Sequence, residues 1–408
     1  MSRIAIVGMT FSGLKNKIKE LGYEYTVLRD VRLQNKTNVN YKYTVWVDFS
    51  TKETIIRSLG ATNEKFDAIV CAYENYVLPA ALIAEFYGLP GLPVAAAEAC
   101  TDKYIMRSLF YKASRKISPE FEVVSDVDST ISFANNHSFP VILKPANLAK
   151  SLLVTKNHDL SELTENYTKS SKLLSGIYKK YAANRKPKMI IEEFMEGSVH
   201  SVDAFVDSNG TPHVLESIVD YQTGYDMGFD DNFHYSRLLP STLKDNEKHD
   251  LIDCAEIGIK ALGIKNSAAH VEIIMTTNGP RIVEIGARNG GYRERMHQLS
   301  NGVDVYTQTL RLSMGEKPDT RIFRNEPCAV LELFPKQAGV FAGLHNEQKL
   351  RSLSSLSYIS IKPEIGDLVG KSADGYKMCA VIVLHNNNEE IFKHDLDFIN
   401  KHVYVKTN

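Results

Sequence analysis

The chain has 408 residues, a length that predicts two to four domains rather than a single core. Its 43% hydrophobic and 24% charged residues are typical of globular proteins and exclude a wholly disordered or collagen-like chain. The sequence has 48 Lys and Arg residues and 49 Asp and Glu residues, so the formal net charge is −1. No overall electrostatic field therefore favours nucleic acid or an anionic membrane as a partner.

The beginning of the chain and its cysteines indicate the compartment. The run before Thr10 holds only about five apolar residues, too few for the core of a signal peptide or for a membrane span. The 5 cysteines are scattered, with no C-x-x-C pair and no histidines at zinc spacing, so we expect reduced thiols in the core. We therefore expect a cytoplasmic protein.

Residues 1–95 alternate between strand and helix signals, which predicts a small α/β domain with a parallel sheet. Helices are expected over 12–21 and 79–87, and strands over 3–7, 25–28, 43–47 and 67–71. Ligands of such sheets bind at the carboxyl ends of the strands. The turn after the first strand, at 8–15, lacks both G-x-G-x-x-G and the P-loop ending, so we interpret it as a tight turn, with ligand contact as the alternative.

The rest of the chain begins after a turn-rich segment at 88–93, where Asp102 can cap a new helix. A solvated polar helix is predicted over 160–181 and a Gly- and Asp-rich loop over 220–236. Further strands are expected near Val141 and at 189–194, 201–206, 213–219, 328–334 and 381–384, with a helix at 246–262. We predict four domains, at 1–95, 96–188, 189–320 and 321–408.

A hairpin is predicted from the strands 270–275 and 281–285, because Asn278-Gly279 between them supplies positive-φ turn residues. Glu272 and Glu284 lie on its two arms, and pairing across the turn can place both carboxylates on one face. Two hard oxygen donors suit Mg²⁺. The alternative is a solvated strand face with unpaired acids.

Two lysines stand where a charge is unusual. Lys103 follows the capping Asp102, and Lys144 ends the apolar run 139–143. Each can neutralise a phosphate, or its side chain can extend along apolar surface to reach solvent.

These residues occur in a family order: Asp102-Lys103, then 139–145 with Ser151, then 191–197 (Ile-Glu-Glu-Phe-Met-Glu-Gly), then Glu272, then Val283-Glu284-Ile285 with Arg288-Asn-Gly-Gly. In this order the chain resembles the ATP-grasp superfamily over about 95–315. The flanking parts look most like its L-amino acid ligase branch. The resemblance implies an α/β protein with an N-terminal parallel-sheet (pre-ATP-grasp) domain, a two-lobed ATP-grasp fold with antiparallel sheets, and a small C-terminal α+β lobe.

The resemblance also implies roles for individual residues. Arg288 would be catalytic, facing the transferring phosphoryl group and the acyl intermediate, and Glu272 with Glu284 would hold Mg²⁺. The implied ATP-binding residues are Lys103 and Lys144 with Ser151 at the phosphates, Glu192 with Glu193, Phe194 and Met195 at the adenine, and His200.

Three positions depart from the family pattern. The segment 146–151 has no glycine, and Lys150 offers charge in its place. Relatives often carry a ribose-binding Glu where this chain has Val199, with His200 beside it. Gly286 stands where relatives often carry Asn, so water would complete the shell of one metal ion.

The favoured function is an ATP-dependent carboxylate–amine ligase that joins two L-amino acids through an acyl phosphate. The alternatives are a carboxylase-type enzyme that forms carboxyphosphate and a nucleotide-binding sensor without catalysis. We expect ATP and Mg²⁺ as cofactors, amino acids as small-molecule substrates, neither nucleic acid nor membrane as a partner, and a homodimer as one arrangement.

Substrate choice is predicted from a loop and an aromatic residue. Asp226, Asp230 and Asp231 lie in the Gly- and Asp-rich loop, and Tyr292 takes the position that limits the acyl pocket in the ligase branch. Carboxylates with an aromatic wall suit a cationic amino acid such as Arg or Lys. The alternative is an acidic loop that only faces water.

Overall fold

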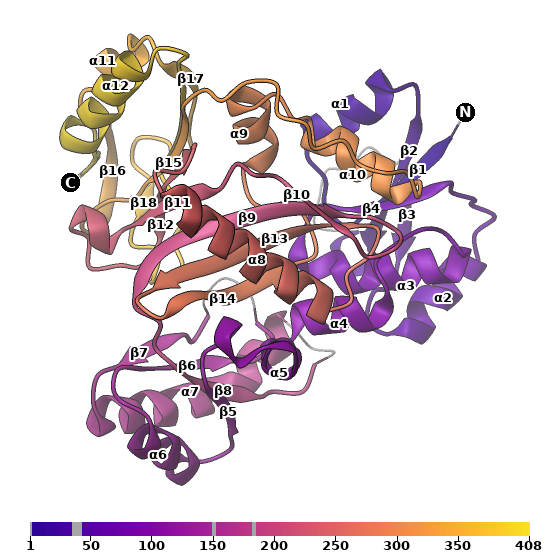
Figure 1. Ribbon diagram of the computed structural model, residues 1–408, viewed down its shortest axis with the longest axis horizontal. Helices are drawn as coiled ribbons and strands as arrows, with labels where there is room; N and C mark the ends of the chain where they lie inside the picture. The colour runs from indigo at the N-terminus through magenta and orange to yellow at the C-terminus, as the bar shows by residue number, and fades with distance from the viewer. Residues whose placement is uncertain (1, 35–42, 149–151, 182–184) are drawn as a thin grey trace.

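A computed structural model describes residues 2–34, 43–148, 152–181 and 185–408, apart from the side chains of 180 and 181. Figure 1 shows the N-terminal domain on the right, a small lobe with α6 and α7 at the bottom, a large twisted sheet in the centre, and the C-terminal lobe in yellow at the upper left. The expected fold class is confirmed: a parallel sheet lies at the N-terminus, and antiparallel sheets follow it.

The N-terminal domain is a parallel sheet in the order β3-β2-β1-β4. The tight turn after β1 depends on Gly8, which has φ of +83° and would place a Cβ only 2.2 Å from the Tyr76 ring. The helix α2 was not foreseen from the sequence. The elements are β1 (Arg3–Val7), α1 (Ser12–Glu20), β2 (Glu24–Asp30), η1 (Val31–Leu33), β3 (Thr44–Val47), α2 (Lys52–Gly60), β4 (Ala68–Cys71), η3 (Glu74–Tyr76) and α3 (Val77–Tyr87).

The small lobe is an antiparallel sheet in the order β5-β8-β6-β7, covered by α6 and α7. The prediction that α7 is a solvated helix is wrong for one of its faces, because Leu163 and Tyr167 are buried against the sheet. The elements over residues 94–193 are α4 (Val94–Thr101), α5 (Lys103–Ala113), η4 (Arg115–Ile117), β5 (Phe121–Val124), α6 (Val127–Asn136), β6 (Val141–Pro145), β7 (Thr155–Asn157), α7 (Leu160–Tyr181) and β8 (Met189–Glu193), of which α4, α5 and η4 pack in another core than the small sheet.

The large sheet is antiparallel, in the order β14-β13-β9-β11-β12-β15-β19-β17, with β10 beside β9. The helix α8 lies across β9, β13 and β14 (Figure 1), and Gly258 allows this close approach because a Cβ there would meet Ile282 at 2.3 Å. The elements are β9 (Gly197–Val206), β10 (Pro212–Val214), β11 (Val219–Thr223), η5 (Tyr225–Met227), β12 (His234–Leu239), α8 (Asp245–Ala261), β13 (Ser267–Thr276), β14 (Gly279–Gly286), α9 (Arg293–Ser300), α10 (Val305–Ser313), β15 (Cys328–Leu333), β17 (Leu356–Ile361) and β19 (Ala380–His385).

The predicted loop at 220–236 is too long. Residues 219–223 and 234–239 form the paired strands β11 and β12, so only 224–233 connect them. Alternation is visible in β11, where Tyr221 is buried and its neighbours Asp220 and Gln222 are more exposed, a pattern that the Gly and Asp content of the segment hid.

The C-terminal lobe packs a second sheet, β18-β16-β20, and the helix α12 on the far side of β15, β19 and β17. Its further elements are β16 (Gly339–Leu344), α11 (Glu347–Arg351), β18 (Leu368–Val369), α12 (Glu389–His402) and β20 (Val405–Thr407). The domain boundaries stay predictions, but hydrogen bonds cross two of them. The strand β8 lies in the small sheet although it follows 188, and β15 continues the large sheet beyond 320.

The cysteines are free thiols, four of them buried, as expected. Burial raises the pKa of the Cys254 thiol to about 12, so this thiol is held neutral and unreactive. Among the described residues, no helix has the length and apolar character needed to cross a membrane.

Candidate active site

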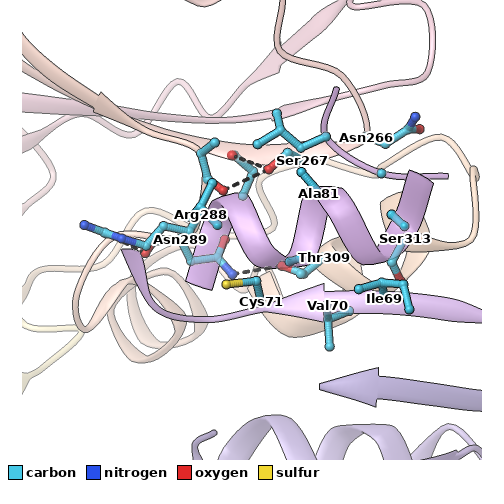
Figure 2. A pocket seen from close by; sticks show the side chains of 17 residues that line it. Ile69, Val70, Cys71, Ala81, Asn266, Ser267, Arg288, Asn289, Thr309 and Ser313 are labelled. Carbon is cyan, nitrogen blue, oxygen red and sulfur yellow. Dashed lines mark hydrogen bonds between the residues drawn. The ribbon is translucent and has the colours of Figure 1, made fainter. Parts of the chain in front are cut away.

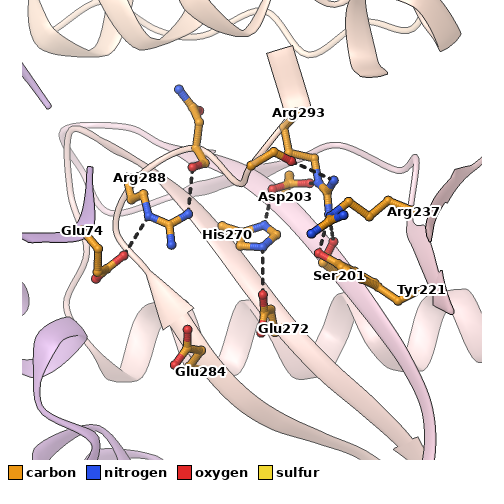
Figure 3. A network of polar contacts seen from close by, with 12 residues as sticks. Glu74, Ser201, Asp203, Tyr221, Arg237, His270, Glu272, Glu284, Arg288 and Arg293 are labelled. Atoms are coloured by element: carbon orange, nitrogen blue, oxygen red, sulfur yellow. Dashed lines mark hydrogen bonds and ion pairs between the residues drawn. The ribbon is translucent and has the colours of Figure 1, made fainter. Parts of the chain in front are cut away.

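The predicted carboxylate pair exists. Glu272 on β13 pairs directly with Glu284 on β14, and a bulge follows immediately after Glu272. The alternating residues Val271 and Ile273 are buried in the core under α8, so the two carboxylates lie on the other face. The Glu272 and Glu284 side chains are 22% and 38% exposed, which leaves them accessible to a ligand (Figure 3).

Lys103 joins this pair from the first turn of α5. Its Nζ lies 3.0 Å from Glu284 Oε2 and 3.5 Å from the carbonyl oxygen of Leu148. Asp102 fixes the start of the helix by accepting hydrogen bonds from the backbone N–H groups of Tyr104 and Ile105, at 2.9 and 3.3 Å. The charge of Lys103 lowers the pKa of Glu284, although burial acts in the opposite direction. A cation and a metal-type carboxylate therefore meet at one point.

Arg288 reaches the same place from the loop after β14. Its Nε donates to Glu74 Oε2 at 2.8 Å, and its Nη1 donates to the carbonyl oxygen of Asn289 at 2.9 Å. Glu74 belongs to η3, immediately beyond the carboxyl end of β4 in the N-terminal domain. Sequence reasoning missed Glu74, although an acid directly after a parallel strand is a signal for a ligand site.

The arrangement explains why Gly286 departs from the family pattern. A Cβ at Gly286 would lie 3.0 Å from Glu74 Oε2 and 3.5 Å from Arg288 Cζ. A larger side chain would push apart the ion pair that joins the two domains. The glycine thus makes room for Glu74 beside Arg288.

A buried polar network lies beside Glu272 on the same face of the sheet (Figure 3). His270 Nε2 lies 3.5 Å from Glu272 Oε1, and His270 Nδ1 donates to Asp203 at 2.7 Å. Arg293 donates to the same Asp203 at 2.9 Å and to Tyr221 Oη at 2.5 Å. Burial alone would raise the pKa of Glu272, but His270 and the other nearby cations hold that pKa below its usual range. Glu272 is therefore charged, as a metal ligand must be.

Lys144 and Glu192 belong to a second cluster that the sequence did not predict. Lys144 Nζ lies 2.6 Å from Glu192 Oε2, and Arg107 Nε lies 2.9 Å from Glu192 Oε1. Arg107 also donates to the carbonyl oxygens of Ile282 and Val283, at 2.9 and 2.8 Å, which ties α5 to β14. The three side chains are at most 8% exposed. Both cations pair with the Glu192 carboxylate, which thereby orients Lys144. The contact of Glu192 with adenine stays a prediction.

The pKa values in this cluster reflect its burial. Burial lowers the pKa of Lys144 to about 8, against the opposing pull of Glu192. The pKa of Glu192 falls to about 2, because Arg107 and Lys144 together outweigh the effect of burial.

The predicted adenine segment lies where β8 leaves the small sheet. Glu193 accepts from Arg281 Nη1 at 3.1 Å, and Lys156 Nζ lies 3.8 Å from the centre of the Phe194 ring. Met195 is half-buried. The roles of these residues in ATP binding stay predictions. Ser151 and Lys150 lie outside the described residues.

His200 is not brought to the carboxylate pair. It pairs with the core residue Ile273, whereas its neighbour Ser201 pairs with Glu272, so strand alternation turns His200 to the rear face of the sheet. There its ring contacts Ser198 Oγ at 2.7 Å and Asp220 Oδ1 at 2.8 Å. The residue beside it, Val199, is the one that faces the site.

The acidic loop makes contacts of its own. Asp226 accepts from the backbone N–H of Thr223 at 2.6 Å, Asp230 pairs with Lys371 at 2.7 Å, and Asp231 accepts from the backbone N–H of Ala373 at 3.0 Å. None of the three contacts Tyr292 or the carboxylate pair through a hydrogen bond or ion pair between described residues. The prediction that they form one pocket with Tyr292 is not supported by these contacts.

Tyr292 instead meets another ion pair. Its hydroxyl donates to Glu332 Oε1 at 2.7 Å, and the Arg237 guanidinium lies 5.2 Å from the centre of its ring. Arg237 also pairs with Glu332 at 3.4 Å, and both side chains are only about a tenth exposed. Arg237 and Glu332 were not singled out from the sequence, because their partners are far away along the chain.

A small cavity of about 50 Å³ lies beside Arg288, between β4, α3 and the start of β13 (Figure 2). Among its walls, Ser267 donates to the carbonyl oxygen of Ala287 and Asn289 donates to Thr309. This volume suits ordered water rather than a substrate.

The two carboxylates suit Mg²⁺ better than a metal ion whose ligands all come from the protein. The described residues contain no cluster of three or more His, Cys, Asp or Glu side chains with metal-ligand geometry. Mg²⁺ is commonly held by one or two carboxylates, with substrate phosphates and water completing the shell. Glu272 and Glu284 supply those two carboxylates.

Comparison with known proteins confirms the resemblance. Residues 137–294 match the sequence model of the ATP-grasp domain family. An alanine–anticapsin ligase of Bacillus subtilis (strain 168) is 27% identical over 252 residues, which cover 59% of this chain and 52% of that protein. The chain thus spans about half the length of this curated relative.

Solved structures share the whole fold. An L-amino acid ligase from Bacillus licheniformis superposes with a TM-score of 0.80 at 18% identity, covering 100% of this chain and 99% of the other. The biotin carboxylase domain dimer of a 2-oxoglutarate carboxylase from Hydrogenobacter thermophilus, solved with MgADP, ADP and bicarbonate, gives 0.66 at 14% identity, covering 99% and 91%.

Proposed function

We propose that this chain, which carries an ATP-grasp domain over residues 137–294, is an ATP-dependent ligase that joins the carboxylate of one L-amino acid to the amine of another. The observation that carries the proposal is the meeting of four groups from separate parts of the chain. Lys103, Arg288 and the pair Glu272–Glu284 supply the positive charge and the metal ligands that phosphoryl transfer needs.

The first half-reaction makes an acyl phosphate. A carboxylate oxygen of the first amino acid attacks the γ-phosphorus of ATP, the bond from phosphorus to the bridging oxygen breaks, and ADP leaves. Lys103 and Lys144 bind the phosphates as point charges. Glu272 and Glu284 would hold Mg²⁺, which would supply positive charge to offset the charge of the phosphates. Glu74 orients the Arg288 guanidinium toward the transferring group.

The second half-reaction makes the amide. The unprotonated amine of the second amino acid attacks the acyl carbon, phosphate leaves, and the nitrogen loses a proton to solvent. Charge develops on the acyl oxygen during this attack, and Arg288 can donate hydrogen bonds to it. The N-terminal domain contributes Glu74, which holds Arg288 at this site through the hydrogen bond from Arg288 Nε.

The acyl side chain would lie near Tyr292, Tyr221 and the Arg237–Glu332 pair. These two charges offset each other, so the pocket offers aromatic walls and no net charge. Such a pocket fits a neutral side chain, and a cationic side chain would have to displace Arg237 from Glu332. A preference for Arg or Lys gains no support from the acidic loop, whose aspartates are engaged elsewhere.

The test is a matrix of L-amino acids, alone and in pairs, assayed for phosphate release with ATP and Mg²⁺, with the product identified by mass spectrometry. We expect release that needs two amino acids and a product whose mass equals their sum minus water. Phosphate release that depends on bicarbonate and not on an amine would contradict the ligase.

That second outcome defines the competing function, a carboxylase-type enzyme that forms carboxyphosphate. It is favoured by the shared fold with a biotin carboxylase domain whose structure holds bicarbonate. Nucleotide binding without phosphate release would instead indicate a sensor. A homodimer is a further hypothesis, which light scattering of the purified full chain would test.

A further inference from the structure

The C-terminal lobe contains a pocket of about 280 Å³ that the proposed reaction does not use. Three segments build it: the middle of the 224–233 connection with the start of β12, the end of β15 with the residues just after it, and the end of α12 with the start of β20. Its lining residues are mostly apolar or aromatic: Met227, Phe229, Tyr235, Leu333, Phe334, Val403, Tyr404 and Val405, with Lys336, Asn400 and Lys401 as the polar ones.

The polar groups are arranged asymmetrically. Tyr235 is buried and its hydroxyl donates to Asn400 Oδ1 at 3.2 Å, so one hydrogen-bonding pair lies at the depth of the pocket. Lys336 and Lys401 are exposed and lie at its opening. Lys336 Nζ is 5.9 Å from the centre of the Phe229 ring, and no acid among the described residues forms an ion pair with it. Lys401 is paired with Asp397 at 2.6 Å.

We propose that this pocket binds a small organic monocarboxylate with an aromatic or aliphatic tail. The tail would replace solvent against Phe229, Phe334 and Val403, and the carboxylate would meet the ammonium of Lys336. The volume is just below the roughly 300–1,000 Å³ of pockets for drug-sized ligands, which limits the ligand to a single ring or a short chain. A zwitterionic amino acid fits less well, because its own ammonium would lie near two lysines.

The pocket shares a wall with the connection that leads to the site. Phe229 packs against Phe233 at 5.2 Å between ring centres, and the next residue, His234, packs edge-on against Tyr221 at 4.5 Å. Tyr221 accepts a hydrogen bond from Arg293, a member of the polar network beside Glu272. A ligand against Phe229 would therefore hold the 224–233 connection and, through it, Tyr221.

Calorimetric titration of the full chain tests the pocket with 3-phenylpropanoate, its amine analogue 3-phenylpropan-1-amine, and L-Phe. We expect the carboxylate to bind more tightly than either of the others. In Lys336→Glu, affinity for 3-phenylpropanoate should fall by about tenfold or more, since a charge-assisted contact is lost. The matched control is Lys393→Glu, another exposed lysine of the same lobe that does not line the pocket.

Hydrogen exchange measures the coupling without any turnover. The amides of Gly224 and Phe229 close the connection through bonds to Phe233 and Gly224, at 2.7 and 2.9 Å, and should exchange more slowly when 3-phenylpropanoate is bound. Equal binding of the amine, undiminished binding in Lys336→Glu, or no binding at millimolar concentration would overturn the site. Unchanged exchange over 224–233 with the ligand bound would overturn the coupling. Neither result depends on whether the chain is a ligase.

Discussion

Two groups of charges flank β14, and they differ in what they can do. The open cluster (Lys103, Glu272, Glu284, Arg288 and Glu74) has side chains that are 20 to 38% exposed. The buried triad (Arg107, Lys144 and Glu192) has side chains at most 8% exposed. Exposed charges can exchange protein partners for phosphate and metal, whereas buried ones must stay paired to remain charged. The open cluster thus suits catalysis, and the triad holds the lobes and one lysine in place.

The largest expected effect concerns the open cluster. Glu284→Ala should abolish Mg²⁺-dependent turnover, because half of the carboxylate pair is lost, while the midpoint of thermal unfolding stays near that of wild type. Phosphate release and differential scanning fluorimetry measure the two quantities. Glu256→Ala is the matched control, because Glu256 is an acid on α8 that forms an ion pair with Lys260 at 2.6 Å. Full activity of Glu284→Ala with Mg²⁺ would remove the metal role of the hairpin.

A substitution in the buried triad should instead reduce mainly the stability of the protein. Arg107→Ala leaves the Glu192 charge poorly compensated and two carbonyl oxygens without a donor, so the free energy of unfolding should fall by about 3–5 kcal/mol. Denaturant titration measures it, with the exposed Arg115→Ala as the control. A loss as small as that of the control would mean that the triad does not stabilise the lobe interface.

Arg288→Lys should reduce the rate by about 10²- to 10³-fold with little change in stability. A lysine keeps the charge but cannot reproduce the planar fork that holds Glu74 and faces the transferring group. Steady-state kinetics gives the rate, and a separate titration with a non-hydrolysable ATP analogue gives nucleotide affinity. If nucleotide affinity fell by the same factor as the rate, Arg288 would be a structural ion pair instead.

Lys144 links the two groups, since it belongs to the triad and is predicted to bind phosphate. Its pKa is lowered to about 8, and a lysine is charged only below its pKa. The KM for ATP should therefore rise as pH increases above 8, by about tenfold at one unit above the pKa, where about a tenth of the enzyme is protonated. Lys144→Arg keeps its charge and should give a flat profile. A wild-type KM that is constant to pH 9 would contradict the lowered pKa.

The sequence predicted local geometry well and distant partners poorly. The hairpin carboxylates follow from alternation and a turn signal within twelve or so residues, and the structure pairs them directly. Arg107 and Glu192 are 85 residues apart, and Arg288 and Glu74 are 214 apart, so no periodicity connects them. His200 is a further case. Its position in the family pattern suggested a role in ATP binding, but the alternation of side chains along β9 places it on the rear face of the sheet.

The smallest effect is expected in the acidic loop, whose aspartates were predicted from the sequence to determine substrate specificity. Asp230 is 72% exposed in its ion pair with Lys371, and exposed pairs add little to stability. Asp230→Asn should leave both the melting temperature and the ranking of Arg, Lys, Met, Leu and Glu as acyl substrates unchanged, and Asp226→Asn should do the same. Glu332→Gln should change that ranking, because it removes the partner of Arg237 beside Tyr292. Turnover of the five amino acids by all three variants shows whether the acidic loop or the Arg237–Glu332 pair beside Tyr292 determines specificity. If Asp230→Asn abolished a wild-type preference for Arg or Lys while Glu332→Gln kept it, the acidic loop would be the specificity pocket after all.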